Sequence, residues 1–154
     1  MQTVFPGMHA MQNLHPLFVH FPIALWVAAL VFESVALLRT SEEWHRSAAR
    51  LLYLGTLFGL AAAATGWIAQ KSMPPSGAAH DVMELHETLM LFAVSAAGWL
   101  SIIAYLRPRL SSAQQKWFLA GLIVLVLLTV FGSDRGAELV FRYATSVRLP
   151  SGPR

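Results

Sequence analysis

Four long runs of apolar residues dominate the hydrophobic pattern of this chain. They cover residues 17–38, 51–69, 88–106 and 117–132, and short polar stretches separate them. A helix needs about 20 mostly apolar residues to cross the hydrocarbon core of a bilayer, with a range of about 17–25. The first three runs have this length, and the fourth reaches it if its helix extends into the flanking Gln115 or Ser133. The pattern therefore predicts an all-α fold with four transmembrane helices.

The composition supports a membrane protein with a single domain. Of the 154 residues, 56% are hydrophobic and 12% are charged, whereas soluble domains carry about 25% charged residues. Four spans leave little chain for a separate soluble unit, so we expect one integral membrane domain over residues 1–154, folded as an up-down bundle. Cysteine is absent, which excludes disulfides, thiolate metal sites, iron–sulfur clusters and c-type haem attachment. The N-terminal residues contain no Lys or Arg, so we expect no cleaved signal peptide.

The basic residues predict the orientation in the membrane. Short loops rich in Lys and Arg stay in the cytoplasm. The loops after the first and third runs are rich in basic residues, namely Arg39, Arg46, Arg50, Arg107, Arg109 and Lys116. The middle loop has only Lys71. We therefore expect a multi-pass protein of a bacterial inner membrane, with both termini on the periplasmic side. This role of the basic residues explains the net charge of +3 without a nucleic-acid partner.

This orientation collects five of the six histidines at the periplasmic ends of the helices. They precede or open the first and third runs, at His9, His15, His20, His80 and His86. The first and third helices of an up-down bundle run parallel and face each other diagonally. His20 and His86 would then lie at similar depths on opposite walls. The sixth histidine, His45, lies in a polar loop on the other side, where we expect it to be solvated.

Two prolines constrain the start of the first span, "HPLFVHFPIAL", residues 15–25. Either the helix begins at Pro16 and is kinked at Pro22, or an extended segment precedes a helix that begins at Pro22. In a continuous helix His15 and His20 lie about 140° apart around the axis, so they would serve different partners.

Histidines on two facing helices suit b-type haem, because axial imidazoles must reach the iron from opposite faces. The ligating nitrogen must be unprotonated, and burial and a helix N-terminus both disfavour imidazolium. We predict a cofactor site formed by His15, His20, His80 and His86. His20 and His86 are the leading iron ligands, because both adjoin the apolar runs. The alternative is that these histidines are hydrogen-bonded polar residues of the bundle.

Other patterns leave further alternatives open. A loose cluster of methionines and histidines comprises Met8, His9, Met11, His15, Met73, His80 and Met83. Thioethers and imidazoles suit copper(I), and zinc is a second possible metal. The small residues Gly55, Gly59 and Ala63 recur every four positions, which allows a helix or a porphyrin to pack closely against them.

Glu33 is an ionisable residue in or near the inner end of the first span. It is either a proton-relay carboxylate or a neutralised residue near the cytoplasmic interface.

The motif "HPLFVHFPIAL" resembles the family of small predicted membrane proteins called domain of unknown function 2231 (DUF2231). His86 in "ELHETLMLF" and the element "ELVFRY", residues 138–143, resemble further elements of that family. The resemblance covers most of the chain. It implies four spans and marks His15, His20 and His86.

Three functions are consistent with these patterns. The first is a membrane electron-transfer subunit that binds b-type haem near the periplasmic face, with a periplasmic electron carrier, a quinone or a larger membrane complex as partner. The second is a non-enzymatic accessory subunit of a larger membrane complex. The third is a copper- or zinc-binding membrane protein. In each case the chain suits a subunit better than a complete enzyme, and the lipid bilayer is its surrounding.

Overall fold

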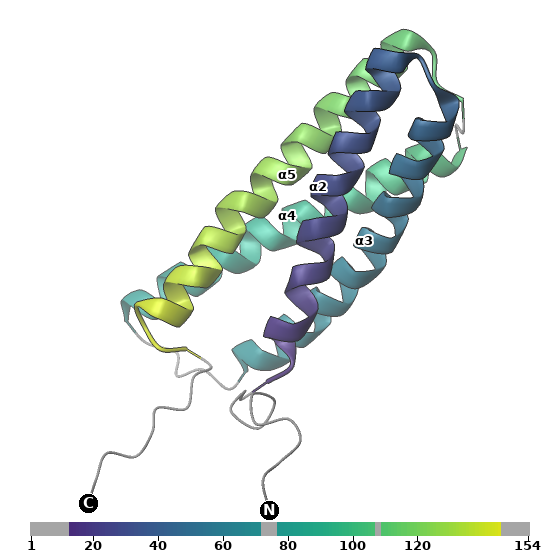
Figure 1. Ribbon diagram of the computed structural model, residues 1–154. Helices are drawn as coiled ribbons and strands as arrows, with labels where there is room; N and C mark the ends of the chain where they lie inside the picture. Colours follow the sequence, from purple (N-terminus) through teal and green to yellow (C-terminus); the bar gives the residue numbers. More distant parts are fainter. Residues whose placement is uncertain (1–12, 72–76, 107–108, 146–154) are drawn as a thin grey trace, which may run out of the picture.

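The computed structural model describes residues 13–71, 77–106 and 109–145. They form four α-helices, α2 (His15–Arg39), α3 (Glu42–Gln70), α4 (Ala78–Leu106) and α5 (Ser112–Phe141) (Figure 1). Each helix is long and apolar enough to cross a membrane. The prediction of an all-α protein with four transmembrane helices is therefore confirmed.

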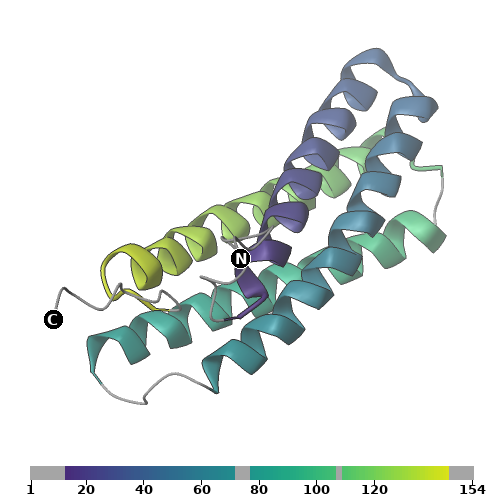
Figure 2. The ribbon, with the colours of Figure 1, turned by 60° about the horizontal axis from the view of Figure 1, so that its bottom comes forward.

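Successive helices run antiparallel and form a closed bundle (Figures 1 and 2). The helix α2 packs against α3 and α5, and α4 packs against the same two helices, so that α2 and α4 lie diagonally opposite each other. At one end of the bundle lie the starts of α2 and α4 and the ends of α3 and α5. We call it the His15–His86 end, and we call the opposite end, where α2 ends and α3 begins, the Glu33–His45 end.

The first helix is continuous through both prolines. Its first backbone N–H, that of His15, donates to Asn13 Oδ1, and Pro16 follows within the first turn, where proline is tolerated. Pro22 lies inside the helix, so the alternative with an extended segment is wrong. The helix ends at Thr40, whose φ of 50° is left-handed and whose N–H bonds to the Ala36 carbonyl.

The fourth helix is longer than its apolar run because polar residues extend it at both ends. Ser111 and Gln114 form a capping box at its start, which satisfies two backbone donors. At its far end the helix continues through Arg135 and Glu138 to Phe141. The predicted run of residues 117–132 is therefore only the apolar middle of a 30-residue helix.

Small residues occupy many core positions of the bundle, beside a few large ones such as Leu52 and Leu122, and many other large apolar residues are exposed. Buried positions include eight alanines, namely Ala29, Ala36, Ala48, Ala49, Ala62, Ala93, Ala97 and Ala104. Large apolar side chains such as Leu57, Phe92 and Trp99 are more than half exposed. Small residues allow helix backbones to approach closely, which is how helices associate in a membrane. The outer surface is thus an apolar surface suited to lipid.

The predicted small-residue seam of α3 packs against a tryptophan. Trp26 of α2 is 2% exposed. A Cβ atom at Gly55 would lie 2.6 Å from Trp26 Cδ1, and one at Gly59 would lie 2.8 Å from Trp26 Cζ2. Of the two alternatives for this seam, the structure shows helix packing, since the indole fills the space along it.

The two helical hairpins, α2–α3 and α4–α5, repeat one pattern of burial. The buried positions Pro22, Trp26, Ala29 and Glu33 of α2 recur at a constant offset as Ala93, Ala97, Leu100 and Ala104 of α4. Those of α3, namely Ala48, Leu52, Gly55, Gly59 and Ala62, recur at a constant offset as Phe118, Leu122, Leu125, Thr129 and Gly132 of α5. The bundle therefore has approximate two-fold symmetry about its long axis.

The Trp26 packing predicts opposite effects for two glycine-to-alanine changes. Gly55→Ala places a methyl group against a rigid indole and should destabilise the protein by about 1–3 kcal/mol. Gly98→Ala is the matched control, because a Cβ atom there meets nothing within 4 Å, and it should be neutral or stabilising by up to about 1 kcal/mol. Thermal unfolding in detergent measures both. Equal melting temperatures for the two variants would contradict the packing described.

Candidate functional site

His15 is fixed against α3 at the very start of α2. Its imidazole is half-buried, and its Nδ1 lies 2.9 Å from the Ala62 carbonyl oxygen and 3.4 Å from Thr65 Oγ1. A carbonyl oxygen can only accept a hydrogen bond, so Nδ1 carries the proton and donates it to Ala62. In this tautomer Nε2 is unprotonated and can act as a ligand.

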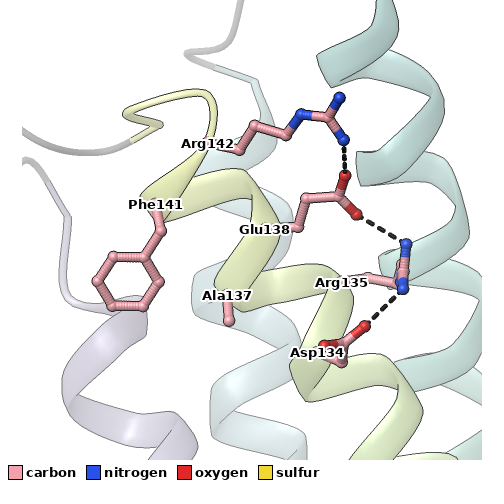
Figure 3. Close-up of a pocket in the computed structure, with 6 residues that line it drawn as sticks. All are labelled: Asp134, Arg135, Ala137, Glu138, Phe141 and Arg142. Atoms are coloured by element: carbon pink, nitrogen blue, oxygen red, sulfur yellow. Dashed lines mark hydrogen bonds and ion pairs between the residues drawn. The ribbon is translucent and has the colours of Figure 1, made fainter.

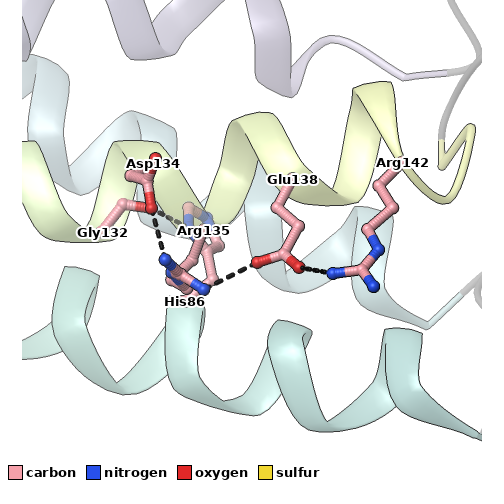
Figure 4. A network of polar contacts seen from close by, with 6 residues as sticks. All are labelled: His86, Gly132, Asp134, Arg135, Glu138 and Arg142. Carbon is pink, nitrogen blue, oxygen red and sulfur yellow. Dashed lines mark hydrogen bonds and ion pairs between the residues drawn. The ribbon is translucent and has the colours of Figure 1, made fainter.

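His86 is fixed against α5 in the same way. Its Nδ1 lies 2.7 Å from the Gly132 carbonyl oxygen (Figure 4). By the same reasoning Nδ1 donates to that carbonyl, and in the neutral imidazole Nε2 is the nitrogen that can act as a ligand. Metal-binding histidines commonly donate their second ring N–H to a backbone carbonyl, which fixes the tautomer and the ring orientation.

The two imidazoles meet across the bundle although they come from diagonally opposite helices. Their ring centroids are 6.3 Å apart, and the ring planes are inclined by 79°. The two histidines are related by the approximate symmetry, since each bonds to a carbonyl of the next helix in the chain, 47 and 46 residues further on. The pair therefore forms a two-imidazole centre at the His15–His86 end.

A glycine one turn beyond each carbonyl makes room for each ring. A Cβ atom at Gly66 would lie 2.9 Å from His15 Cε1, and one at Gly136 would lie 3.0 Å from His86 Cε1. Both separations are shorter than ordinary van der Waals contact between carbon atoms, which is about 3.5–4.0 Å. Glycine at these positions therefore lets each imidazole lie directly on the neighbouring helix.

Charged residues of α5 form a network beside His86 (Figures 3 and 4). Arg135 bridges Asp134 and Glu138, and Arg142 binds the other oxygen of Glu138 at 2.9 Å. These four side chains line an open surface pocket together with Ala137 and Phe141. Two cationic and two anionic groups balance each other here. The four side chains in the last turns of α5 therefore carry no net charge as a group.

His20 does not face His86, which differs from our expectation. It is exposed on the outside of α2, and its Nδ1 lies 2.8 Å from the Pro16 carbonyl oxygen of the same helix. The reason is helical geometry: because α2 is continuous from His15, His20 is rotated by about 140° away from the inward-facing His15. The structure brings His15 and His86 together instead.

His80 pairs with its own helix rather than with the two-imidazole centre. Its Nε2 lies 3.2 Å from Glu84 Oε1, one turn further along α4. Of the methionine and histidine cluster, Met8, His9, Met11 and Met73 lie outside the described residues. Within residues 13–71, 77–106 and 109–145, no group of three or more His, Cys, Asp or Glu side chains could hold a metal ion.

A second buried pair lies at the Glu33–His45 end. Glu33 is fully buried and His45 is 5% exposed, so the prediction of a solvated His45 is wrong. The cause is that α3 begins at Glu42, which places His45 in the first turn of a packed helix. The spacing of Trp26, Ala29 and Glu33 on one helical face is the sequence pattern that could have revealed the burial of Glu33.

Comparison with known proteins connects this chain to one family. The family model described as "Predicted membrane protein (DUF2231)" matches residues 11–148. The match includes all four helices and both members of the two-imidazole centre, and it confirms the resemblance of the sequence to that family. A search of curated proteins and a search of solved structures found no match.

The hydrogen bonds of the centre predict the tautomers of its histidines. In 15N-labelled protein, both His15 and His86 should be protonated at Nδ1, because each Nδ1 faces a carbonyl oxygen. Long-range 1H–15N correlation spectra measure this, and single His→Gln variants assign the signals. A neutral imidazole protonated only at Nε2, at either position, would contradict the geometry, because its Nδ1 could not donate to the carbonyl.

Proposed function

We propose that this chain, which belongs to the DUF2231 family of predicted membrane proteins, is a membrane electron-transfer subunit that binds b-type haem through His15 and His86. The observation that carries the proposal is the pair of imidazoles held 6.3 Å apart on diagonal helices, with each Nδ1 bonded to a backbone carbonyl, so that a neutral imidazole at either position would offer Nε2 as a ligand. Of the four histidines predicted for the cofactor, these are the two that the structure brings together.

The separation of the rings fits ligands on opposite sides of one metal ion. With metal–nitrogen bonds of about 2.1 Å, two such imidazoles have ring centroids about 6 Å apart. The observed separation of 6.3 Å agrees with this value. The donor set therefore suits an ion with two axial imidazole ligands, which is the arrangement found in bis-histidine haem proteins.

The number of donors favours haem over a bare metal ion. A structural zinc ion takes four ligands, and among the described residues no third His, Cys, Asp or Glu joins the pair. Haem brings its own four equatorial nitrogens, so two protein ligands complete the coordination. Copper(I) prefers soft ligands and is the alternative that metal analysis must distinguish from haem.

The residues of this chain would position the group and set its surroundings. Bound haem would supply one-electron redox chemistry. The Ala62 and Gly132 carbonyls fix the imidazole orientation and raise the basicity of the ligating nitrogens, while Gly66 and Gly136 keep the rings close to their helices. The orientation predicted from the basic residues places the centre at the periplasmic face of a bacterial inner membrane, where a soluble carrier, a quinone or a larger membrane complex would exchange electrons.

A separate observation favours association with a larger membrane complex. His20 is exposed on the outer surface of α2, and the neighbouring Phe21 stacks on Phe58 with ring centroids 4.7 Å apart. An ionisable side chain that faces lipid is costly and is usually covered by protein or exposed to water. The second candidate function is therefore an accessory subunit whose α2 surface contacts another subunit.

The haem proposal predicts a specific absorption spectrum. Protein purified in mild detergent after expression with ample haem should show a Soret band of low-spin, bis-histidine type. His15→Ala and His86→Ala should each weaken haem binding by at least about 10-fold, since loss even of an outer-shell partner costs 10–100-fold.

Two matched variants control for general damage to the bundle. His20→Ala and His80→Ala should keep the spectrum, because their side chains lie outside the two-imidazole centre. If wild-type protein lacks a Soret band both in native membranes and after purification, the proposal fails. Stoichiometric copper or zinc in that haem-free protein would establish the metal alternative.

A further inference from the structure

The Glu33–His45 end contains an ionisable pair that the proposed function does not use. Glu33 Oε2 lies 2.7 Å from His45 Nδ1, and both side chains are almost completely buried. Glu33 is 18 residues beyond His15 in one continuous helix, which corresponds to about 27 Å along the axis. The pair is thus separate from the two-imidazole centre.

Each side chain of this pair has a second polar atom that is buried without a partner. Among the described residues, Glu33 Oε1 and His45 Nε2 are both inaccessible and make no hydrogen bond. Buried polar atoms are nearly always hydrogen-bonded, and each exception calls for an explanation such as a catalytic role or a bound water. Two such atoms on one bonded pair indicate a site that is built to accept something.

The approximate symmetry of the bundle shows that the fold does not require this pair. The positions equivalent to Glu33 and His45 in the second hairpin are Ala104 and Gln115. Ala104 is buried in the same way as Glu33, so an apolar residue satisfies the packing there. The first hairpin therefore carries an ionisable pair where the second carries none.

The geometry defines where an additional proton would bind. The short contact is best explained by a His45 Nδ1–H that donates to the Glu33 carboxylate. With a neutral imidazole, this pair has one negative charge. A proton added to His45 Nε2 gives an imidazolium–carboxylate pair, and one added to Glu33 Oε1 gives a neutral acid beside a neutral imidazole. Either product has no net charge, which lowers the cost of keeping the pair inside a membrane.

No other charged side chain of the described residues neutralises the pair. On the surrounding helices the charged and titratable groups at this end are exposed, namely Arg39 of α2, Glu42, Glu43, Arg46 and Arg50 of α3, Tyr105 of α4 and Lys116 of α5, with Arg109 just before α5. Tyr53 is half-buried two turns further along α3. The inward neighbour of His45 on α5 is Phe118, at 5.6 Å between ring centroids.

We propose that Glu33 and His45 form a buried proton-binding site, which takes up one proton from the aqueous phase at the Glu33–His45 end of the bundle. The two unpartnered atoms are the positions at which this proton binds. His45 lies in the first turn of α3, between the exposed residues Trp44 and Arg46. The proposal does not depend on haem, because it concerns groups of the protein alone.

Spectroscopy on the wild-type protein tests this site directly. Spectra are recorded from about pH 8 to about pH 5, the range in which histidine ordinarily changes its charge, to detect the proton that the site takes up. The gain should appear either as protonation of both His45 nitrogens in 15N spectra, or as a carboxylic acid C=O band in hydrogen/deuterium difference infrared spectra of protein with 13C-labelled Glu.

Three variants assign the signal and separate the site from a static ion pair. His45→Gln should abolish the imidazole signal and Glu33→Gln the carboxyl signal, whereas Glu43→Gln, an exposed carboxylate of the same region, should leave both unchanged. If neither signal changes over this pH range in folded wild-type protein, the pair is static and the proposal is overturned. This wild-type result decides the question even if Glu33→Gln fails to fold, and a protein that lacks haem can still show it.

Discussion

A polar group in the interior of a membrane protein must find its partner within the protein, and this constraint explains most of the polar contacts in the bundle. Water is absent from the hydrocarbon region, so an unpaired group there is costly. Ser34, Thr56 and Thr129 each donate to the carbonyl four residues earlier in their own helix. The side chains of His15, His86 and Glu33 instead bond across to the next helix. These interhelical bonds connect the same helices that the small core residues bring close together.

The approximate two-fold symmetry gives these contacts a common origin. In both hairpins a histidine near the start of the first helix bonds to a carbonyl near the end of the second, and a glycine follows one turn later. Two equivalent hairpins that pack around one axis must place these two histidines near that axis. The position of the two-imidazole centre therefore follows from the repeat.

The departures from symmetry distinguish the two ends of the bundle. Glu33 and His45 have no ionisable counterparts in the second hairpin, and the charged network of Asp134, Arg135, Glu138 and Arg142 belongs to α5 alone. One end thus has two symmetry-related imidazoles, and the other has an asymmetric ionisable pair.

The sequence by itself determined the fold class, because four apolar runs of membrane-spanning length permit few other structures. It also determined that histidines lie at one end, because their positions relative to the apolar runs specify which ends of the helices they occupy. Only the tertiary structure decided that His15 rather than His20 meets His86. That outcome depends on the helix beginning at His15 and on its rotation about its axis, neither of which the pattern around Pro16 and Pro22 specifies. The burial of His45 was likewise decided by packing, since a polar segment that starts a helix looks the same in sequence as a solvated loop.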